Sequence, residues 1–329
     1  MLVRRNRRGD FLNMILAGDI GGTNARFGCL ERKPEGGWQV HNFAKLKGSD
    51  YPSFDAAIKS YLSALDIRPR LAAFAAAGPV EAGYINLTNT DWQISARRIE
   101  DMHGFKTCAL FNDFAGMTRS IPELSDEDFT IIREGQARTD EPVLVAGPGT
   151  GFGVGYLVPT KSGWHVMSTE GGHIAYSPQT SLELELLQVL KRDHDFVSLE
   201  LVSSGKGLPV IHKAVCEIHG APYEFMEPDL IRQGANTGNA VARDVCGIRA
   251  AAAMGALGDL ALSGGARGGI VLAGGVSERM IDFYMQPAAM NRYLHRGPQS
   301  DYVKSIPMRL LNSPLAPLIG SAALLEDTL

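Results

Sequence analysis

The sequence predicts an α/β fold in two domains, and three observations support this prediction. Its 329 residues exceed what one hydrophobic core usually fills, so two domains of ordinary size are expected. Short apolar runs that end in glycine indicate buried strands. Segments with a helical spacing of apolar residues fill the gaps between them, and this alternation is typical of α/β architecture. Two domains also make a ligand cleft available between them.

Four short apolar runs each stop at a glycine, which predicts a buried strand leading into a tight turn. They occupy residues 14–17 before Gly18, 71–77 before Gly78, 143–146 before Gly147 and 270–273 before Gly274. Residues 15–23 and 144–151 look alike, and a second strand follows each of them, at 26–30 and 154–158. This weak internal repeat predicts two related halves facing one cleft; a chance likeness of two glycine turns is the alternative.

Helical patterns occupy the intervening segments. Residues 53–65 place apolar side chains close to a 3.6-residue period. Thr180 and Glu183 have the spacing of a capping box in front of a leucine-rich run. An alanine-rich stretch at 241–262 leads to Gly264 and Gly265, where a helix commonly ends in a left-handed residue. Three helices are therefore expected at these places.

Composition excludes several classes of function. Hydrophobic residues make up 45% of the chain and charged residues 21%, the balance of a folded globular protein. The net charge of −4 offers no basic surface for a polyanion, so nucleic acid is not expected as a partner. No run of about 18 apolar residues stands out, so no membrane is expected as a partner either. The four cysteines lack a Cys-x-x-Cys pair, which predicts reduced core residues rather than a zinc site or disulfides.

The first residues are basic. Arg4, Arg5, Arg7 and Arg8 resemble the start of a signal peptide, but the apolar segment that follows is too short and Asp19 interrupts it. Residues 1–13 are therefore expected to form a disordered basic extension, with Met14 as an alternative start.

Residues 18–26 carry the strongest chemical signal. Gly21 and Gly22 lack a Cβ, so successive backbone N–H groups can converge on phosphate oxygens. Thr23 adds a hydroxyl donor. Asp19 would repel phosphate directly, so its expected task is to hold Mg²⁺ through water beside the phosphates. The alternative is a plain hairpin turn, which explains an aspartate between two apolar runs poorly.

Two further glycine turns fit the same chemistry. Residues 147–153 form a second candidate phosphate loop, in which Thr150 and Gly151 offer donors. Gly274 and Gly275 join a strand to a helical segment and would let the backbone approach adenine or ribose. A plain strand-to-helix turn explains the last pair equally well.

Polar residues follow the apolar run at 108–110. Asn112 and Asp113 lie at the end of this predicted strand, where α/β folds line their ligand crevices. Transfer of a phosphoryl group to a hydroxyl needs a carboxylate that accepts the hydroxyl proton, and Asp113 is the candidate base. The alternative is that Asp113 only caps the helix expected near residue 114.

Three more polar residues complete the candidate set. Glu170, His173 and Glu200 suit sugar recognition together with Asn112, because carboxylates and amides accept hydrogen bonds from neighbouring hydroxyls. Taken singly, Glu200 fits an exposed helix position and His173 the end of a turn. Metal binding by His173 is not expected, because no His or Cys stands nearby.

In this order, the motifs resemble the bacterial glucokinase family, in the hexokinase branch of the actin-like ATPase superfamily. The resemblance covers nearly the whole chain from Met14 onward. Residues 18–26 look like its first phosphate motif, 147–153 like the second and 273–276 like the adenosine motif. Stretches 86–92, 170–173 and 200–208 are also similar.

The resemblance implies a two-domain actin-like ATPase (ribonuclease H-like) fold with an interdomain cleft. Residues 14–123 with 313–329 would form a small domain, and 124–312 a large one. Asp113 would be the catalytic base, and Asn112, Asp113, Glu170, His173 and Glu200 would contact the sugar. The expected ATP-binding residues are Gly18, Asp19, Ile20, Gly21, Gly22, Thr23, Thr150, Gly151, Gly274 and Gly275.

The expected reaction is transfer of the γ-phosphoryl group of ATP, with Mg²⁺, to the 6-hydroxyl of glucose, the first step of glycolysis. The resemblance also implies a cytoplasmic homodimer. The alternatives are a kinase for mannose or an amino sugar, a phosphatase of the polyphosphate class, and a non-catalytic sugar sensor. Asp19 and Asp113 argue against the sensor, which needs neither a base nor a metal carboxylate.

Overall fold

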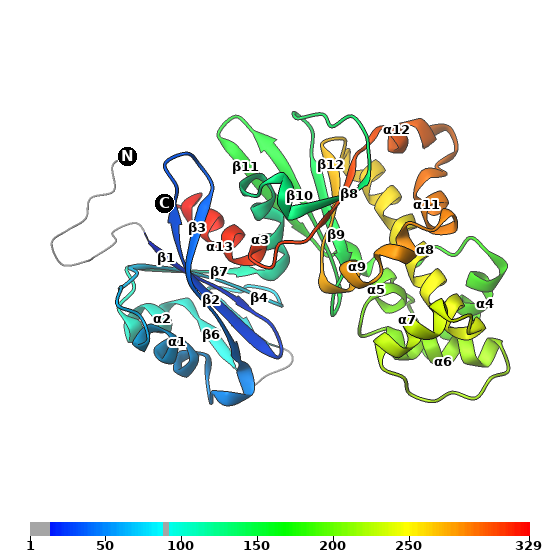
Figure 1. Cartoon of the computed structure of the whole chain (residues 1–329), viewed down its shortest axis with the longest axis horizontal. Coiled ribbons are helices and arrows are strands. Elements are labelled where there is room, and N and C mark those ends of the chain that lie inside the picture. The colour runs from blue at the N-terminus through cyan, green and yellow to red at the C-terminus, as the bar shows by residue number, and fades with distance from the viewer. Residues whose placement is uncertain (1–13, 88–91) are drawn as a thin grey trace. The chain divides into compact units, whose positions relative to one another are not determined.

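The computed structural model describes residues 14–87 and 92–329 (Figure 1). The predicted extension at 1–13 and residues 88–91 of the stretch 86–92 lie outside the described residues. The chain divides into two units, one reaching Asp126 and including Ser313–Leu329, the other spanning Glu127–Asn312. The chain thus leaves the first unit and returns to it for its last helix.

The first unit is built on a five-stranded sheet in the order β3-β2-β1-β4-β7. β1 pairs antiparallel with β2 and parallel with β4, and β4 pairs parallel with β7. The strands are β1 (Ile15–Ile20), β2 (Asn24–Arg32), β3 (Trp38–Lys47), β4 (Leu71–Ala76) and β7 (Thr107–Asn112), and a separate two-stranded sheet joins β5 (Tyr84–Asn86) to β6 (Gln93–Ser95). The carboxyl ends of β1, β4 and β7 therefore lie at one edge of the sheet.

Both faces of this sheet are buried, as the continuous apolar run of β1 predicts. Leu16 and Ile20 belong to one core cluster, together with residues of two helices, whereas Ile15 and Ala17 belong to another with the last helix. This division follows from the two-residue period of a strand. The helices of the unit are α1 (Phe54–Ser63), α2 (Ala96–His103), α3 (Asp113–Ser120) and α13 (Ala316–Glu326), with 3₁₀ turns at Gly48–Asp50 and Ile121–Glu123.

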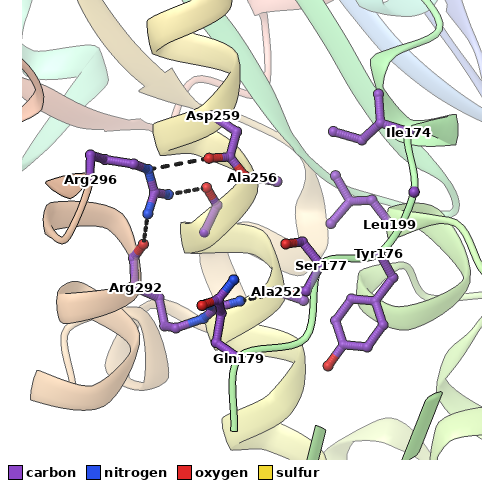
Figure 2. Close-up of a pocket in the computed structure, with 12 residues that line it drawn as sticks. Ile174, Tyr176, Ser177, Gln179, Leu199, Ala252, Ala256, Asp259, Arg292 and Arg296 are labelled. Carbon is purple, nitrogen blue, oxygen red and sulfur yellow. Dashed lines mark hydrogen bonds and ion pairs between the residues drawn. The ribbon is translucent and has the colours of Figure 1, made fainter. Parts of the chain in front are cut away.

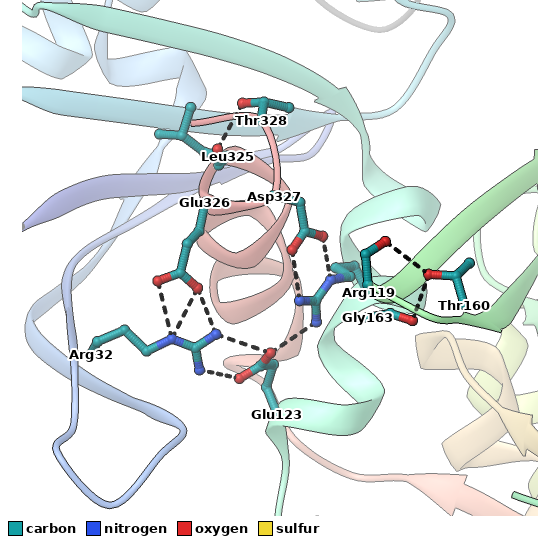
Figure 3. Close-up of polar contacts among 10 residues, drawn as sticks. Arg32, Arg119, Glu123, Thr160, Gly163, Leu325, Glu326, Asp327 and Thr328 are labelled. Atoms are coloured by element: carbon teal, nitrogen blue, oxygen red, sulfur yellow. Dashed lines mark hydrogen bonds and ion pairs between the residues drawn. The ribbon is translucent and has the colours of Figure 1, made fainter.

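A chain of ion pairs fastens the last helix to the first unit (Figure 3). Arg119 donates to Asp327 (Nε to Oδ2, 2.7 Å) and to Glu123 (Nη1 to Oε1, 2.9 Å). Arg32 bonds the same Glu123 and also Glu326, at 2.6 Å from Nη2 to Oε2. Glu123 is thus held by two guanidinium groups and joins β2, α3 and α13 in one network.

Replacement of Glu123 is expected to lower the free energy of unfolding by an amount that depends on pH. Burial acts to raise the pKa of this carboxyl, but hydrogen bonds and charges from Arg32 and Arg119 outweigh it, so the pKa lies below its usual range. The stabilisation is therefore complete above the unfolded pKa of about 4.3 and is lost as the pH falls through the folded value. Glu123→Gln should cost about 1–2 kcal/mol at pH 7 by urea unfolding, since Arg32 is partly exposed, although Arg119 is buried.

The control for this experiment is Glu35→Gln, because Glu35 lies exposed in the turn before β3. The deficit of Glu123→Gln should shrink as the pH is lowered from 7 through the folded pKa of Glu123. A deficit that keeps its size down to the lowest pH at which the protein stays folded would contradict the assignment.

The second unit is built on a six-stranded sheet in the order β11-β10-β9-β12-β13-β8. β9 pairs antiparallel with β10 and parallel with β12, as β1 does with β2 and β4. The strands are β8 (Phe129–Arg133), β9 (Val143–Pro148), β10 (Phe152–Thr160), β11 (Gly163–Thr169), β12 (Gly269–Leu272) and β13 (Met308–Leu311). Five strands in each sheet share one topology, so the repeat predicted from the two glycine turns is confirmed.

One long helix, α8 (Ala240–Gly264), organises the core of the second unit. Among the helices of the described residues, α8 alone is long and apolar enough to cross a membrane, but 78% of its 18-residue apolar stretch is buried inside the protein. Arg249 interrupts its apolar sequence and is itself buried, donating to the carbonyl oxygens of Ser203 and Ser204 at 3.1 and 3.0 Å. Packing thus accounts for its apolar character.

The remaining helices of the second unit pack around α8 and the sheet. They are α4 (Ser181–Leu190), α5 (Leu199–Ser203), α6 (Leu208–Ile218), α7 (Pro228–Asn236), α9 (Gly275–Arg279), α10 (Ile281–Tyr284), α11 (Pro287–Leu294) and α12 (Ser300–Ser305), with 3₁₀ turns at Asp126–Asp128, Gly171–His173 (η4) and Gly297–Gln299.

The local predictions on strands, caps and cysteines are confirmed. Each of the four glycine-terminated runs forms a strand. Thr180 and Glu183 form the predicted capping box, and Gly265 ends α8 in the left-handed conformation at φ 63°. All four cysteines are free and buried.

Candidate active site

The turn between β1 and β2 presents two unpaired amides. The N–H of Gly21 donates to the carbonyl of Asn24 at 3.0 Å and closes the turn. The N–H groups of Gly22 and Thr23 make no hydrogen bond within the described residues, and both residues are exposed. This leaves two neighbouring donors of the kind a phosphate oxygen accepts.

Asp19 lies buried near the end of β1, directly opposite Arg26 in the register of β2. Arg26 Nη1 donates to Asp19 Oδ2 at 2.5 Å. Burial raises the pKa of the Asp19 carboxyl, and the charge and hydrogen bond of Arg26 act in the opposite direction. The guanidinium therefore compensates a carboxylate that would otherwise be costly to bury.

Gly18 and Ile20 are packing positions within β1. The Ile20 side chain is fully buried in the core. A Cβ on Gly18 would lie 2.6 Å from Cδ1 of Phe74, so the strand needs glycine there for close packing. Any contact that these two residues make with a nucleotide would therefore come from their backbone.

Asn112 and Asp113 lie at the same edge of the sheet as Asp19. The registers pair Ile20 with Ala76, and Ala76 with Asn112, so the ends of β1, β4 and β7 are level. Asn112 caps α3, because its Oδ1 accepts the N–H groups of Phe114 and Ala115 at 2.9 and 3.2 Å. The capping role that was the alternative for Asp113 therefore belongs to Asn112.

The Asp113 carboxyl is suited to accept a proton. Burial and the neighbouring charge of Asp19 raise its pKa, whereas hydrogen bonds from the backbone N–H groups of Phe114 and Asp113 act to lower it. The Phe114 amide lies 2.8 Å from Oδ1 and holds the side chain in place. A raised pKa makes a carboxylate a stronger base than aspartate in water.

The second glycine loop, between β9 and β10, leaves its amides unpaired at the same places as the first, although a different hydrogen bond closes it. The Gly149 N–H donates to the Gly151 carbonyl at 2.8 Å and closes the turn. The N–H groups of Thr150 and Gly151 make no hydrogen bond in the described parts of the chain. Both loops thus expose two amides at equivalent places of the repeat.

The third glycine turn packs directly on the second loop. Gly274 has φ 96°, and a Cβ there would lie 2.7 Å from the carbonyl oxygen of Pro148. A Cβ on Gly147 would in turn lie 2.2 Å from the carbonyl oxygen of Ala273. Only glycine permits this backbone-to-backbone contact. Gly275, the first residue of α9, follows this contact directly.

Backbone contacts place the predicted sugar-binding residues of the second unit, Glu170, His173 and Glu200, on neighbouring segments. Glu170 and His173 are exposed at the two ends of η4, and a Cβ on Gly172 of that turn would lie 2.1 Å from the Phe152 carbonyl. The Leu199 N–H donates to the Ile174 carbonyl at 2.8 Å, which places Glu200 beside the segment that follows His173.

Each unit therefore assembles its own part of the predicted set. In the first unit, Asp19, the exposed turn at Gly22 and Thr23, Asn112 and Asp113 lie at one sheet edge. In the second unit, the second glycine loop contacts the third glycine turn and Glu200 of α5, and η4 packs against Phe152 at the end of that loop.

Comparison with known proteins identifies the family. A family model described as glucokinase matches residues 16–328. The chain belongs to the glucokinase family. It is therefore assigned to the ATP-dependent hexose kinases and has their two-domain actin-like ATPase fold.

Individual glucokinases are similar along nearly the whole chain. The glucokinase of Caulobacter sp. (strain K31) is 35% identical over 316 residues, covering 94% of both chains. The crystal structure of a glucokinase from an Antarctic psychrotroph is 34% identical, with a TM-score of 0.87 over 96% of this chain and 99% of that one. A ROK family glucokinase from Streptomyces griseus, solved with glucose and AMPPNP, is 19% identical over 94% and 98% of the chains with a TM-score of 0.58, which shows the shared fold.

A cavity of about 80 Å³ is lined in part by the segment that follows His173 (Figure 2). None of the predicted glucokinase site residues line it. Its lining includes Ile174 and Leu199, and also the side chains of Arg292 and Arg296. Arg292 Nη2 donates to the Ser177 carbonyl at 2.7 Å, and Arg296 Nη1 to the Arg292 carbonyl at 2.6 Å. The first bond ties the segment to α11, and the second holds Arg296 against the same helix, so the lining of the cavity supports the segment next to the site.

Two partners of the site residues were missed by the sequence analysis. Arg26 received no role, although its position opposite Asp19 follows from the strand–turn–strand pattern once the turn length is known. The turn at Gly205 and Lys206 belongs to the similar stretch 200–208, but its contact with the second glycine loop was not predicted. This turn bonds the second glycine loop, and no local pattern indicates a contact between segments so far apart in the sequence.

Proposed function

We propose that this chain transfers the γ-phosphoryl group of ATP to the 6-hydroxyl of glucose, giving glucose 6-phosphate and ADP. One observation carries the proposal: in a member of the glucokinase family, a carboxyl with a raised pKa, Asp113, shares a sheet edge with a glycine turn whose amides are unpaired. A base and a phosphate loop are the two parts that phosphoryl transfer to a hydroxyl requires.

Asp113 acts as the base in this mechanism. It accepts the proton of the 6-hydroxyl as the oxygen attacks the γ-phosphorus, and the Phe114 amide keeps the carboxylate in position. The unpaired amides of the two glycine loops bind phosphate oxygens and stabilise the charge on the transferring group. The Gly274–Gly275 turn supports the adenosine end.

Asp19 is suited to hold Mg²⁺ through water. The described residues contain no cluster of three or more His, Cys, Asp or Glu side chains that could cage a metal. Mg²⁺ is usually bound by one or two carboxylates together with substrate phosphates, which matches a single buried aspartate beside a phosphate loop. When bound, the ion neutralises charge on the ATP phosphates.

The sugar is proposed to bind Asn112, Asp113, Glu170, His173 and Glu200. Carboxylates accept hydrogen bonds from hydroxyls, and the exposed ring of His173 can donate or accept. Asn112 has committed its oxygen to the α3 cap and one amide proton to the Gly78 carbonyl at 3.2 Å. Its remaining contribution to the sugar is one N–H donor.

A coupled assay of ADP release with glucose and MgATP tests the proposal directly. Turnover with glucose above that with mannose or an amino sugar supports glucokinase activity, whereas a preference for another sugar moves the assignment to that substrate. Glucose binding without turnover would identify the sensor that was the alternative, and phosphate release without a sugar the phosphatase.

Asp19→Asn is expected to raise the Mg²⁺ concentration needed for half-maximal turnover by about 10- to 100-fold, the usual cost of losing an outer-sphere carboxylate. The variant keeps the shape of the side chain and a hydrogen-bond acceptor for Arg26. A Mg²⁺ titration at saturating ATP and glucose measures the effect. An unchanged Mg²⁺ requirement would remove Asp19 from the metal site.

The cytoplasmic location, the homodimer and closure of an interdomain cleft on the substrates remain predictions from the family resemblance. Light scattering coupled to size-exclusion chromatography measures the oligomeric state. Small-angle scattering with and without glucose measures closure.

A further inference from the structure

Glu200 contacts the second glycine loop as well as the predicted sugar site. Its Oε2 accepts the backbone N–H of Phe152 at 2.8 Å. Phe152 is the first residue of β10 and follows Thr150 and Gly151, the predicted phosphate-binding residues. A carboxylate expected to bind the sugar thus holds the end of a phosphate loop.

The two oxygens of Glu200 have different surroundings. Oε2 is engaged by the Phe152 amide, whereas Oε1 makes no hydrogen bond within the described residues. The side chain is partly exposed, so Oε1 is accessible to a hydroxyl. The Glu200 carboxylate can therefore accept a hydrogen bond from the loop with one oxygen and from a sugar hydroxyl with the other.

The segment that follows Glu200 strengthens this connection. The N–H of Gly205 donates to the Gly149 carbonyl at 2.9 Å, and the N–H of Lys206 to the Thr150 carbonyl at 3.1 Å. Together with the Glu200 side chain, three hydrogen bonds join α5 and its following turn to one loop. The loop and the carboxylate are therefore held as one unit.

Gly151 is the closest point of this contact. A Cβ at position 151 would lie 2.5 Å from Oε2 of Glu200 and 3.2 Å from its carboxyl carbon. Such a Cβ meets the flexible end of a side chain rather than backbone, so the carboxylate would move while the fold survives. The absence of a side chain at 151 thus fixes where the Glu200 carboxylate lies.

We propose that Glu200 couples the sugar site to the phosphate loop, so that sugar affinity depends on glycine at 151 and nucleotide affinity depends on the length of the side chain at 200. This inference rests on the proposed function, because it takes Glu200 as a sugar ligand and the loop at 149–152 as a phosphate ligand. If glucose changes AMPPNP affinity through this contact, AMPPNP must change glucose affinity by the same factor, because two linked binding equilibria affect each other equally.

Gly151→Ala tests the first half of the proposal in the absence of any nucleotide. Glucose affinity, measured by calorimetry, should fall by about tenfold, since a hydrogen bond to a charged group is displaced. The control is Gly247→Ala in α8, away from this loop, where a Cβ would also meet nothing within 4 Å. The control should bind glucose as the wild type does.

Two results would overturn this half. One is wild-type glucose affinity in Gly151→Ala, and the other is an equal loss in both alanine variants. If the wild type itself binds glucose but never phosphorylates it, the proposed function fails while the coupling stands. If the wild type binds no glucose, the assignment of the sugar site is wrong, and this half of the proposal fails with it.

Glu200→Asp tests the second half and does not depend on the folding of the loop variant. The shorter carboxylate withdraws from the Phe152 amide, so AMPPNP affinity without sugar should fall about three- to tenfold as the loop loses its anchor. Glu185→Asp, at an exposed position of α4, is the control and should bind AMPPNP normally. Unchanged AMPPNP affinity in Glu200→Asp would overturn the reciprocal coupling.

Discussion

Asp113→Ala should lower kcat by at least about 100-fold, with glucose affinity affected much less. The reason is that a neutral hydroxyl attacks poorly unless a positioned carboxylate accepts its proton, and Asp113 is held by the Phe114 amide for that purpose. Single-turnover and steady-state ADP release measure kcat, and calorimetry measures glucose binding. Asp66→Ala, at an exposed position after α1, is the control.

The same residue should set the acid side of the pH profile. Because burial and the charge of Asp19 raise the pKa of Asp113, kcat/KM should fall with decreasing pH through a value above the ordinary aspartate pKa of about 3.9. Near-normal kcat in Asp113→Ala would remove this residue from the role of base, and an acid limb at or below the ordinary aspartate pKa would contradict the raised value.

Gly320→Ala should destabilise the protein by about 3 kcal/mol or more, which is large for a single methyl group. Gly320 lies in α13 where that helix crosses α3, and a Cβ there would lie 1.6 Å from the carbonyl oxygen of Gly116. The obstacle is backbone, so the helices must separate. Urea unfolding measures the loss.

The control for this variant is Gly247→Ala, which lies in α8 with nothing within 4 Å of the new Cβ. That substitution should be neutral or stabilising by up to about 1 kcal/mol, as alanine favours helix more than glycine. Equal stability of Gly320→Ala and the wild type would mean that α3 and α13 do not cross as described.

Much of the fold follows from local sequence patterns. The runs before Gly18 and Gly147 are strands because they are continuously apolar and end where a turn needs glycine. Thr180 caps α4 because its hydroxyl and the Glu183 carboxylate satisfy amides within one turn of chain. Such features depend on residues close in the sequence, so they can be predicted.

The rest depends on contacts between distant segments. Asn112 rather than Asp113 caps α3, because where the strand ends determines which side chain reaches the first amides. The pairing of Arg26 with Asp19 follows from the strand register, and the bond from Phe152 to Glu200 joins residues 48 apart. The order of the motifs along the chain predicts which residues belong to the site. Local patterns do not predict which hydrogen bonds and ion pairs position each side chain.

The return of the chain to its first unit has a consequence for biosynthesis. Ile15, Ala17 and Ala73 are covered by α13, which is translated last. Domains generally fold as units while synthesis proceeds from the N-terminus. The first unit is synthesised first, but its last helix is synthesised at the end. On the ribosome, this apolar face of the sheet therefore stays uncovered while the whole of Glu127–Asn312 is synthesised. A nascent chain stalled before Ala316 should therefore recruit chaperones that the released protein does not.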